Sequence, residues 1–566
     1  MDARTAPVLV RELHRPRRVL IVGDGTAGWI TASLLRRTAP PEVTITLVES
    51  ATDVPVMGAG ESTLAGIRHL LRSVGIDEGE FFADADATFK MGVRFQGWNP
   101  ARDFWHPFGA VLGPSVLVTD WLRTAARGGG AAIDDVLDQG TGKIAAARLA
   151  PQSTGCPPYT GDLRVFGYHA DAARLVDLVR HRTIAAGVRR VVDDVTDVEV
   201  GPGEWIRQVH TAEHGPLEAD LFFDCTGFRG RLIHQALGEP FDPFSRHLWC
   251  DKAVAIDVPA EPADSGDLFP YTVSAAHSAG WIWEIPLFSR SCNGYVYSSA
   301  YLSPQQAEAE LRAHLGVPDD IPARHINMRV GKSRRTWVGN CIAVGPADGF
   351  IEPLDSTGTG LVQSTGAFFM AESADLAWDD KLAARMNAYR DAMYDGLRDF
   401  VVCHYVTSPR NDTPFWRDLH RDQAVVTPGV EDVLGQWHSG VLTGLRRMDG
   451  GTPSFSPYSW AYVIGGNGLR PERAADAEVD ADELARAKAD LAACAAAVAA
   501  MSAKLPDHRL RLRELRQAWQ RGERPPLGPE EPSNLAYQQM EKYMTDSKRG
   551  LLGAYNETRH QPAGAL

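Results

Sequence analysis

The sequence of 566 residues predicts an α/β fold in which apolar strands alternate with helices around a parallel sheet. Three observations support this prediction. An apolar strand at 19–22 leads through a glycine-rich turn into a helix, and a second apolar strand follows at 43–50. Two later segments, 221–231 and 340–360, each contain an apolar strand that ends at a turn with glycine and aspartate. Because the carboxyl ends of parallel strands share one edge of a sheet, these turns are expected to lie close together.

The segment 17–50, which begins RRVLIVGDGTAGWITASLLRR, has the order strand, turn, helix, strand. Gly23, Gly25 and Gly28 fit G-x-G-x-x-G, in which the first glycine makes the tight turn, the second admits a pyrophosphate and the third lets helix and strand pack closely. Glu49 ends the second strand about twenty residues later, where a ribose-binding carboxylate is expected. We therefore predict a Rossmann-type dinucleotide site with contacts from Gly23, Gly25, Thr26, Ala27, Gly28 and Glu49.

The two later segments favour FAD over NAD as the dinucleotide. The first contains Asp224 before a Thr-Gly turn, and the second contains Gly345 and Asp348. In two-part flavoproteins, segments of this kind return the chain to the cofactor, although ordinary strand–turn boundaries can look the same. The sequence has no second glycine fingerprint for a nicotinamide cofactor. We therefore expect a separate flavin reductase to be the partner that supplies reduced FAD.

Composition and charge narrow the class of protein. The chain is 44% hydrophobic and 23% charged, as in soluble globular proteins. Its net charge of −14 argues against nucleic acid or an anionic membrane as partner. The seven cysteines are scattered without a C-x-x-C pair, so neither a disulfide framework nor a metal site is predicted. Because no apolar run has the length of a signal peptide or a membrane span, a cytoplasmic protein is expected.

The stretch GWIWEIPL at 280–287 places Trp281 and Trp283 at alternate positions and interrupts the pattern with Pro286. A strand sends alternate side chains to one face of a sheet, so both indoles are predicted to project in the same direction. For an isolated W-x-W, packing in the core of a sheet is a sufficient explanation.

Six separated motifs together resemble those of the flavin-dependent tryptophan halogenases, and the resemblance covers about the first 470 residues. The resemblance implies a two-part flavoprotein fold like that of p-hydroxybenzoate hydroxylase, with a mainly helical substrate-binding part interleaved within 1–470. It also implies a flavin-binding strap with Gly60, Glu61 and Ser62 at the cofactor. The six motifs are GDGTAGW (23–29), MGAGEST (57–63), TFKMGVRFQGW (88–98), FWHPFG (104–109), GWIWEIPL (280–287) and FIEPLDSTG (350–358).

In that family, reduced flavin, oxygen and halide yield hypohalous acid, which reaches an essential lysine beside the arene. The resemblance assigns this role to Lys90, whose amine would either donate a hydrogen bond to hypohalous acid or hold the halogen covalently. A solvated lysine on a strand edge is the structural alternative. The resemblance also places His106 and Phe108 beside the substrate. It makes Trp281 and Trp283 a wall between flavin and substrate.

The motif FIEPLDSTG contains the predicted catalytic carboxylate and the halide site. The family has a glutamate directly before Ser-Thr-Gly, whereas this chain has Asp355, which is one methylene shorter. A carboxylate at this place stabilises positive charge on the indole and accepts its proton. Thr357 and Gly358 are expected to bind chloride, or bromide, through N–H groups at a helix start, with Ser356 in the substrate pocket. An ordinary helix cap is the alternative explanation of these residues.

Family members that act on free tryptophan hold its amino and carboxyl groups with a Tyr-Tyr pair and a following glutamate. The corresponding region here, 430–469, contains no Tyr-Tyr, and neither does the rest of the chain. Because a free amino acid would lose these polar partners, we expect halogenation of tryptophan within a peptide, as in lantibiotic biosynthesis. Free tryptophan or another small indole, held by a different clamp, is the first alternative. An aromatic flavin monooxygenase or a non-catalytic flavoprotein is the second.

From about residue 471 the composition becomes rich in alanine and charged residues, which predicts a helical extension over 471–566. We expect its helices to pack along the body of the protein. A role in dimerisation, and therefore a homodimer, is the alternative.

Overall fold

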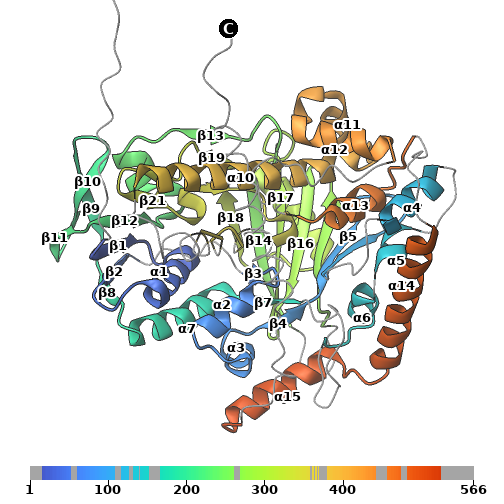
Figure 1. The fold of residues 1–566 in the computed structure, drawn as a ribbon, viewed down its shortest axis with the longest axis horizontal. Helices are drawn as coiled ribbons and strands as arrows, with labels where there is room; N and C mark the ends of the chain where they lie inside the picture. Colours follow the sequence, from blue (N-terminus) through green and yellow to red (C-terminus); the bar gives the residue numbers. More distant parts are fainter. Residues whose placement is uncertain are drawn as a thin grey trace, which may run out of the picture.

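The computed structural model of the chain describes a mixed α/β protein, as the sequence predicts (Figure 1). It covers residues 16–523 apart from internal gaps. The residues outside this description are 1–15, 53–59, 109–115, 127–131, 139, 152–165, 261–267, 357, 359, 363, 366–367, 369–378, 441–454, 473–480 and 524–566.

A six-stranded sheet forms the dinucleotide-binding core, on the left of Figure 1. Its strands are parallel except for β20, which pairs antiparallel with β21. The helices α1 (Thr26–Thr38) and α7 (Ala172–Ala185) pack together beside it. The predicted strands near 19–22, 43–50, 221–224 and 341–343 are therefore confirmed. The order of the strands is β20 (Trp337–Val338), β21 (Cys341–Ala343), β12 (Leu221–Asp224), β1 (Arg18–Val22), β2 (Thr44–Glu49) and β8 (Arg189–Val192).

A seven-stranded sheet stands next to this core, in the centre of Figure 1. It is antiparallel except for the pairing of β15 with β5. The sequence predicted its strand β16 from the W-x-W pattern, but not the sheet to which β16 belongs. The order is β18 (Ala323–Asn327), β14 (Lys252–Pro259), β17 (Arg290–Tyr297), β16 (Gly280–Pro286), β15 (Thr272–His277), β5 (Gly92–Gln96) and β6 (Phe104–Pro107).

A small three-stranded sheet brings together two of the predicted motifs, MGAGEST and TFKMGVRFQGW, on either side of a strand that the sequence did not single out. Its order is β3 (Gly60–Ser62), β7 (Gly167–Asp171) and β4 (Thr88–Lys90), and both pairings are antiparallel. Two further small sheets contain β9 (Val195–Gly201), β10 (Trp205–Thr211) and β11 (Gly215–Glu218), and β13 (Phe241–Pro243), β19 (Gly331–Ser333) and β22 (Gly349–Phe350).

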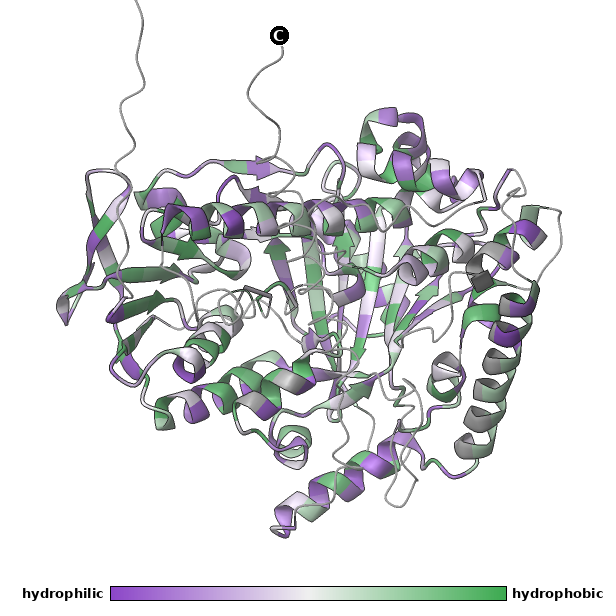
Figure 2. Ribbon diagram, viewed as in Figure 1, coloured by the Kyte–Doolittle hydropathy of each residue, from purple (hydrophilic) through white to green (hydrophobic). Residues whose placement is uncertain are grey.

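Helices surround the seven-stranded sheet and form the predicted helical part. The longest, α10 (Asp380–Thr407), crosses the upper side of both large sheets in Figure 1 and contacts α12, α13 and β20. Hydrophobic residues concentrate on the strands of the two large sheets, whereas α15 alternates between hydrophobic and hydrophilic positions (Figure 2). The other helices are α2 (Ile67–Ser73), α3 (Glu78–Asp84), α4 (Val116–Ala126), α5 (Ile133–Leu137), α6 (Thr141–Ala146), α8 (Pro304–Leu315), α11 (Pro414–Arg421), α12 (Pro428–His438) and α13 (Pro457–Gly466).

Two helices of the C-terminal extension pack along the body, as expected. The helix α14 (Ala481–Ser502) contacts α4, and Lys488 forms an ion pair with Asp120 at 2.8 Å. The helix α15 (His508–Gln520) contacts α3, and Nε2 of His508 accepts a hydrogen bond from the backbone N–H of Phe89 at 3.2 Å. Among the helices that the structure describes, none is long and apolar enough to cross a membrane.

Candidate active site

The three glycines of the N-terminal fingerprint have three different surroundings. Gly23 has a φ of 113°, and a Cβ there would lie 2.2 Å from the carbonyl oxygen of Cys225, so only glycine fits this turn. A Cβ on Gly28 would lie 1.9 Å from the carbonyl oxygen of Gly23, because α1 packs directly on the turn. A Cβ on Gly25 would meet no protein atom within 4 Å. Gly25 therefore faces open space at the N-terminus of α1, where a phosphate group binds favourably.

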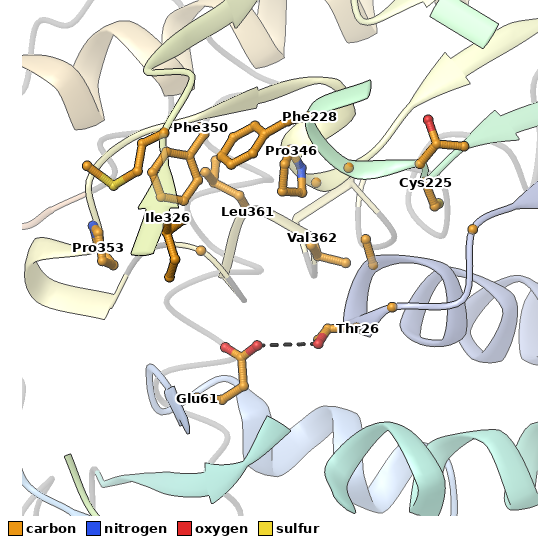
Figure 3. Close-up of a pocket in the computed structure, with 18 of the residues that line it drawn as sticks. Thr26, Glu61, Cys225, Phe228, Ile326, Pro346, Phe350, Pro353, Leu361 and Val362 are labelled. Carbon is orange, nitrogen blue, oxygen red and sulfur yellow. Dashed lines mark hydrogen bonds between the residues drawn. The ribbon is translucent and has the colours of Figure 1, made fainter. Parts of the chain in front are cut away.

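This open space belongs to a cavity of about 610 Å³ between the two large sheets. The predicted residues Gly23, Gly25, Thr26 and Ala27 line it, together with the turn after β12. Figure 3 shows Glu61 of the strap reaching across to Thr26, whose hydroxyl donates a hydrogen bond to the carboxylate at 3.3 Å. Residues of many elements line the cavity, and the glycine cradle before α1 is part of its wall. These features fit the pyrophosphate and the body of FAD.

Predicted and additional residues both contribute to the wall of the cavity. The strap residues Gly60, Glu61 and Ser62 line it, as does Gly345. The labelled side chains of Figure 3 that the sequence did not single out include Phe228, Ile326, Pro346, Phe350, Pro353, Leu361 and Val362.

Three carboxylates that were predicted to contact the cofactor are engaged by other groups of the protein. Glu49 accepts hydrogen bonds from Arg190 at 2.8 Å and from Arg180 at 3.5 Å. Asp224 accepts four hydrogen bonds from residues of its own turn and the following helix, at 2.6 to 3.0 Å. Asp348 is fully buried and pairs with Arg390 at 2.6 Å. None of the three is among the residues that line the described cavity. They hold the turns in place, and a direct contact with FAD stays a prediction.

Lys90 is fully buried at the end of β4, which rules out the solvated lysine. Its Nζ donates a hydrogen bond to Oγ of Ser356 at 2.6 Å and lies 4.9 Å from the ring centre of Phe108. Burial lowers the pKa of Lys90 to about 7, against the opposing charge of Asp355. An amine with this pKa is available in both its protonated and its neutral form near neutral pH.

Asp355 is buried between two histidines from different elements. Its Oδ1 accepts a hydrogen bond from Nδ1 of His106, on β6, at 3.0 Å. Nε2 of His404, on α10, lies 3.2 Å from Oδ2 in a close polar contact that is not aligned as a hydrogen bond. Burial raises the pKa of Asp355, but the two histidines outweigh burial and the net pKa is well below its usual value. Asp355 therefore remains a carboxylate at neutral pH.

The backbone at this carboxylate is unusual. Asp355 and Ser356 have φ values of 59° and 63°, in the left-handed region of the backbone that residues other than glycine rarely adopt. Such a conformation costs about 1–2 kcal/mol per residue. Strain of this kind accumulates at functional sites, where surrounding contacts enforce it. Here the contacts are those of Asp355 with the histidines and of Ser356 with Lys90.

Trp281 and Trp283 project in the same direction, as predicted, and both line the cavity. Their ring centres lie 6.3 Å apart. Gly294 makes room for Trp283, since a Cβ on Gly294 would lie 2.1 Å from the indole. The N–H of Trp281 donates to the buried carboxyl of Glu352 at 2.9 Å, which fixes the plane of its ring.

The structure describes one of the two residues that were predicted to bind the halide. Thr357 lies outside the described residues. Gly358 is described and lines the cavity near Asp355 and Ser356.

Sequence reasoning missed several residues of this site. His404 and Tyr405 are buried here, and Tyr405 donates at 2.6 Å to Glu352, a carboxylate of the FIEPLDSTG motif to which the resemblance assigns no catalytic role. Burial raises the pKa of Glu352 to about 7, although the donors Tyr405 and Trp281 oppose this shift. The adjacent His404-Tyr405 pair in an otherwise apolar helical run was the available signal. The sequence did not show that this pair lies beside Asp355, because that depends on how α10 is placed in the fold.

The comparisons agree with this geometry. The sequence profile of the tryptophan halogenase family matches residues 18–483. The tryptophan 6-halogenase SttH of Streptomyces toxytricini is 36% identical over 494 residues, which are 81% of this chain and 92% of SttH. Its crystal structure has a TM-score of 0.78, with 33% identity, and the match covers 88% of this chain and 100% of the SttH chain.

Two further relatives are similar. The tryptophan 7-halogenase RebH of Lentzea aerocolonigenes is 34% identical over 452 residues, covering 76% of this chain and 84% of RebH. The crystal structure of MibH, a lathipeptide tryptophan 5-halogenase, has a TM-score of 0.74 with 27% identity and covers 91% of this chain and 95% of its own. The fold, the glycine cradle and the family match lead to one conclusion: the chain belongs to the tryptophan halogenase family of flavin-dependent enzymes.

Proposed function

We propose that the protein is a two-component, FAD-dependent halogenase that replaces a ring hydrogen of a tryptophan indole with chlorine, bromine being the alternative halogen. The observation that carries this proposal is the fully buried Lys90, whose amine is held by Ser356, a residue that lines the flavin-sized cavity together with Asp355. A hydroxylase has no need of such an amine.

The cofactor chemistry comes from FAD, which is reduced by a separate enzyme and, with oxygen, supplies the oxidising power that converts halide into hypohalous acid. The residues of the chain then control where the halogen goes. Trp281 and Trp283 separate the flavin side from the arene side, so the arene is kept away from the cofactor. Lys90 holds the halogen donor through its amine, which burial keeps partly neutral near pH 7.

The Asp355–His106 pair serves the loss of the ring proton. A carboxylate only accepts hydrogen bonds, so Nδ1 of His106 bears the proton that Asp355 binds. Nε2 is then the ring nitrogen of His106 at which the pair can accept a proton. Since a carboxylate with a low pKa is a weak base, we assign proton acceptance to the pair rather than to Asp355 alone. The charge of Asp355 stabilises the positive ring.

Tryptophan within a peptide is the proposed substrate. The absence of a Tyr-Tyr pair in the chain supports it, as does the likeness to MibH, which acts on a lathipeptide by its name. Free tryptophan is the second candidate, because SttH and RebH are named tryptophan halogenases and have higher identity to this chain.

The variant Lys90→Met tests the reaction itself. Methionine is similar in length and apolar, so the buried site retains its packing. With reduced FAD, oxygen, chloride and an indole substrate, the wild-type protein is expected to give a chlorinated product. The variant is expected to give no chlorinated product while it oxidises reduced FAD at the wild-type rate. Equal product from both proteins, or an added oxygen atom in place of chlorine, contradicts the proposal.

Mass spectrometry of parallel reactions tests the substrate. One reaction contains free tryptophan, and the other contains tryptophan-bearing peptides of the lantibiotic type. A chlorine isotope pattern on the peptide alone supports the proposed substrate. Rapid chlorination of free tryptophan would instead favour the second candidate.

A further inference from the structure

A continuous row of hydrogen bonds links Lys90 to a histidine on another strand. Nζ of Lys90 donates to Ser356 at 2.6 Å, and Oγ of Ser356 donates to Ser62 at 2.8 Å. Oγ of Ser62 lies 2.8 Å from Oγ1 of Thr272, which lies 2.9 Å from Nε2 of His169. His169 is fully buried on β7, and neither it nor Thr272 belongs to the motifs of the sequence analysis.

The far end of this row fixes the direction of every hydrogen bond in it. Oγ1 of Thr88 donates to the carbonyl oxygen of Pro286 at 2.6 Å, because a carbonyl can only accept. Thr88 must therefore accept from Nδ1 of His169, which lies 3.0 Å away. A neutral imidazole protonated on Nδ1 has a bare Nε2, so Thr272 donates to it. Burial, followed by the charges of Lys90 and His508, holds the pKa of His169 well below its usual value, which keeps it neutral.

The same direction continues to the amine. Since Thr272 donates to His169, it accepts from Ser62, and Ser62 accepts from Ser356. The lone pairs of Ser356 then face Lys90, which binds as a donor. With the opposite tautomer of His169 every hydroxyl would reverse, and Ser356 would donate to the lone pair of a neutral Lys90. The halogen donor needs that lone pair.

The small three-stranded sheet builds this row. Ser62 of β3 lies opposite His169 of β7, and His169 lies opposite Thr88 of β4. Residues directly opposite one another project to the same face of a sheet. Lys90 follows Thr88 by two positions, so it also projects to that face.

We propose that His169 is a positioning residue for Lys90, and that its tautomer acts through the hydroxyls of Thr272, Ser62 and Ser356 to leave the amine lone pair free. The catalytic consequence rests on the proposed function. The direction of the hydrogen bonds does not, so the two can fail separately.

The first test measures the tautomer of His169 by NMR, from two-bond ¹H–¹⁵N couplings in protein labelled at histidine. The variant His169→Gln identifies the signal. The expected result is a neutral ring protonated on Nδ1 across pH 6 to 8. A ring protonated on Nε2 would overturn the proposal, whatever the enzyme halogenates.

The second test uses a matched pair of variants at Thr272. Thr272→Val has the same shape without the hydroxyl, and Thr272→Ser keeps the hydroxyl. We expect the valine variant to lose about five-fold or more in halogenated product per FAD oxidised, the effect of one lost hydrogen bond, with the serine variant within about two-fold of wild type. Flavin binding, followed by fluorescence, should be the same in both. Equal product yields for valine and serine would contradict the proposal. A wild-type protein without halogenated product would instead refute the proposed function.

Discussion

Burial and charge act in opposite directions on the ionisable residues of this site. Lys90 is removed from water and donates a hydrogen bond to Ser356, and burial lowers its pKa to about 7 although Asp355 favours the protonated form. The same desolvation raises the pKa of Glu352 to about 7. Asp355 is the exception, since two histidines outweigh its burial. Asp355 is therefore a permanent carboxylate, whereas Lys90 and Glu352 change protonation near neutrality.

The pH dependence of halogenation should follow the protonation of the Lys90 amine. As pH rises through 7, Lys90 loses its proton, and the product formed per FAD oxidised is expected to increase. In Asp355→Asn the negative charge that favours the ammonium is gone, so the inflection should move to lower pH. Quenched single-turnover reactions between pH 5.5 and 9 measure this. A yield that falls through pH 7 would indicate that Lys90 acts as a hydrogen-bond donor instead.

Single residues of the site were predictable to different degrees. Lys90, His106 and the two tryptophans lie in motifs that resemble those of a known family, and only that resemblance assigned their roles. The pairing of Asp355 with His404 could not be predicted, because it depends on how α10 crosses the sheet. The arginine partners of Glu49 and Asp348 were missed for the same reason.

At the scale of elements, the turn between β1 and α1 shows why a short pattern predicts structure well. Gly28 is required by a contact within the turn, with Gly23, and Gly23 is required by a contact with Cys225, which directly follows the neighbouring parallel strand β12. The seven-stranded sheet has the opposite character. Its strand β5 pairs in parallel with β15, from a distant part of the chain, so local sequence gave no indication of the sheet.

Two alanine variants in this turn should separate folding from flavin binding. Gly28→Ala places a Cβ 1.9 Å from the carbonyl oxygen of Gly23, so we expect a loss of stability of several °C in Tm. Gly25→Ala meets no protein atom within 4 Å, so its Tm without flavin should match wild type. Because its methyl group enters the space for the pyrophosphate, it should bind FAD at least about ten-fold more weakly.

Thermal unfolding and flavin fluorescence measure the two effects. If Gly25→Ala binds FAD as well as wild type, the cofactor does not approach this turn.

At the scale of the whole molecule, the C-terminal extension contacts the strand that contains Lys90. His508 on α15 accepts from the N–H of Phe89, the residue directly before Lys90. Its other nitrogen lies 3.3 Å from the carbonyl oxygen of Leu268. Composition predicted a packed helical extension, but it could not predict that the extension contacts β4.

Lowering the pH should reveal how much His508 contributes to stability. Burial lowers the pKa of His508 to about 4, below the value near 6.5 of an unfolded histidine. Between these values the unfolded chain binds a proton that the folded chain does not, so the free energy of unfolding falls as pH falls from 6.5 to 4, by up to about 3 kcal/mol.

The variant His508→Gln cannot titrate but keeps an acceptor for Phe89. Its stability, measured by urea unfolding at several pH values, should fall less steeply across this range than that of wild type. Parallel pH profiles for the two proteins would show that His508 does not titrate as expected.

The contact between α15 and β4 has a consequence for the order in which parts of the protein form during synthesis. The strands of the six-stranded sheet end by Ala343 and the cavity lining ends at Val362, whereas the contact of α15 with β4 needs His508, far later in the chain. During synthesis, the sheet and the cavity wall are therefore available well before the helix that supports β4. A protein cut between α13 and α15 would keep this wall and lose the support of the strand that contains Lys90.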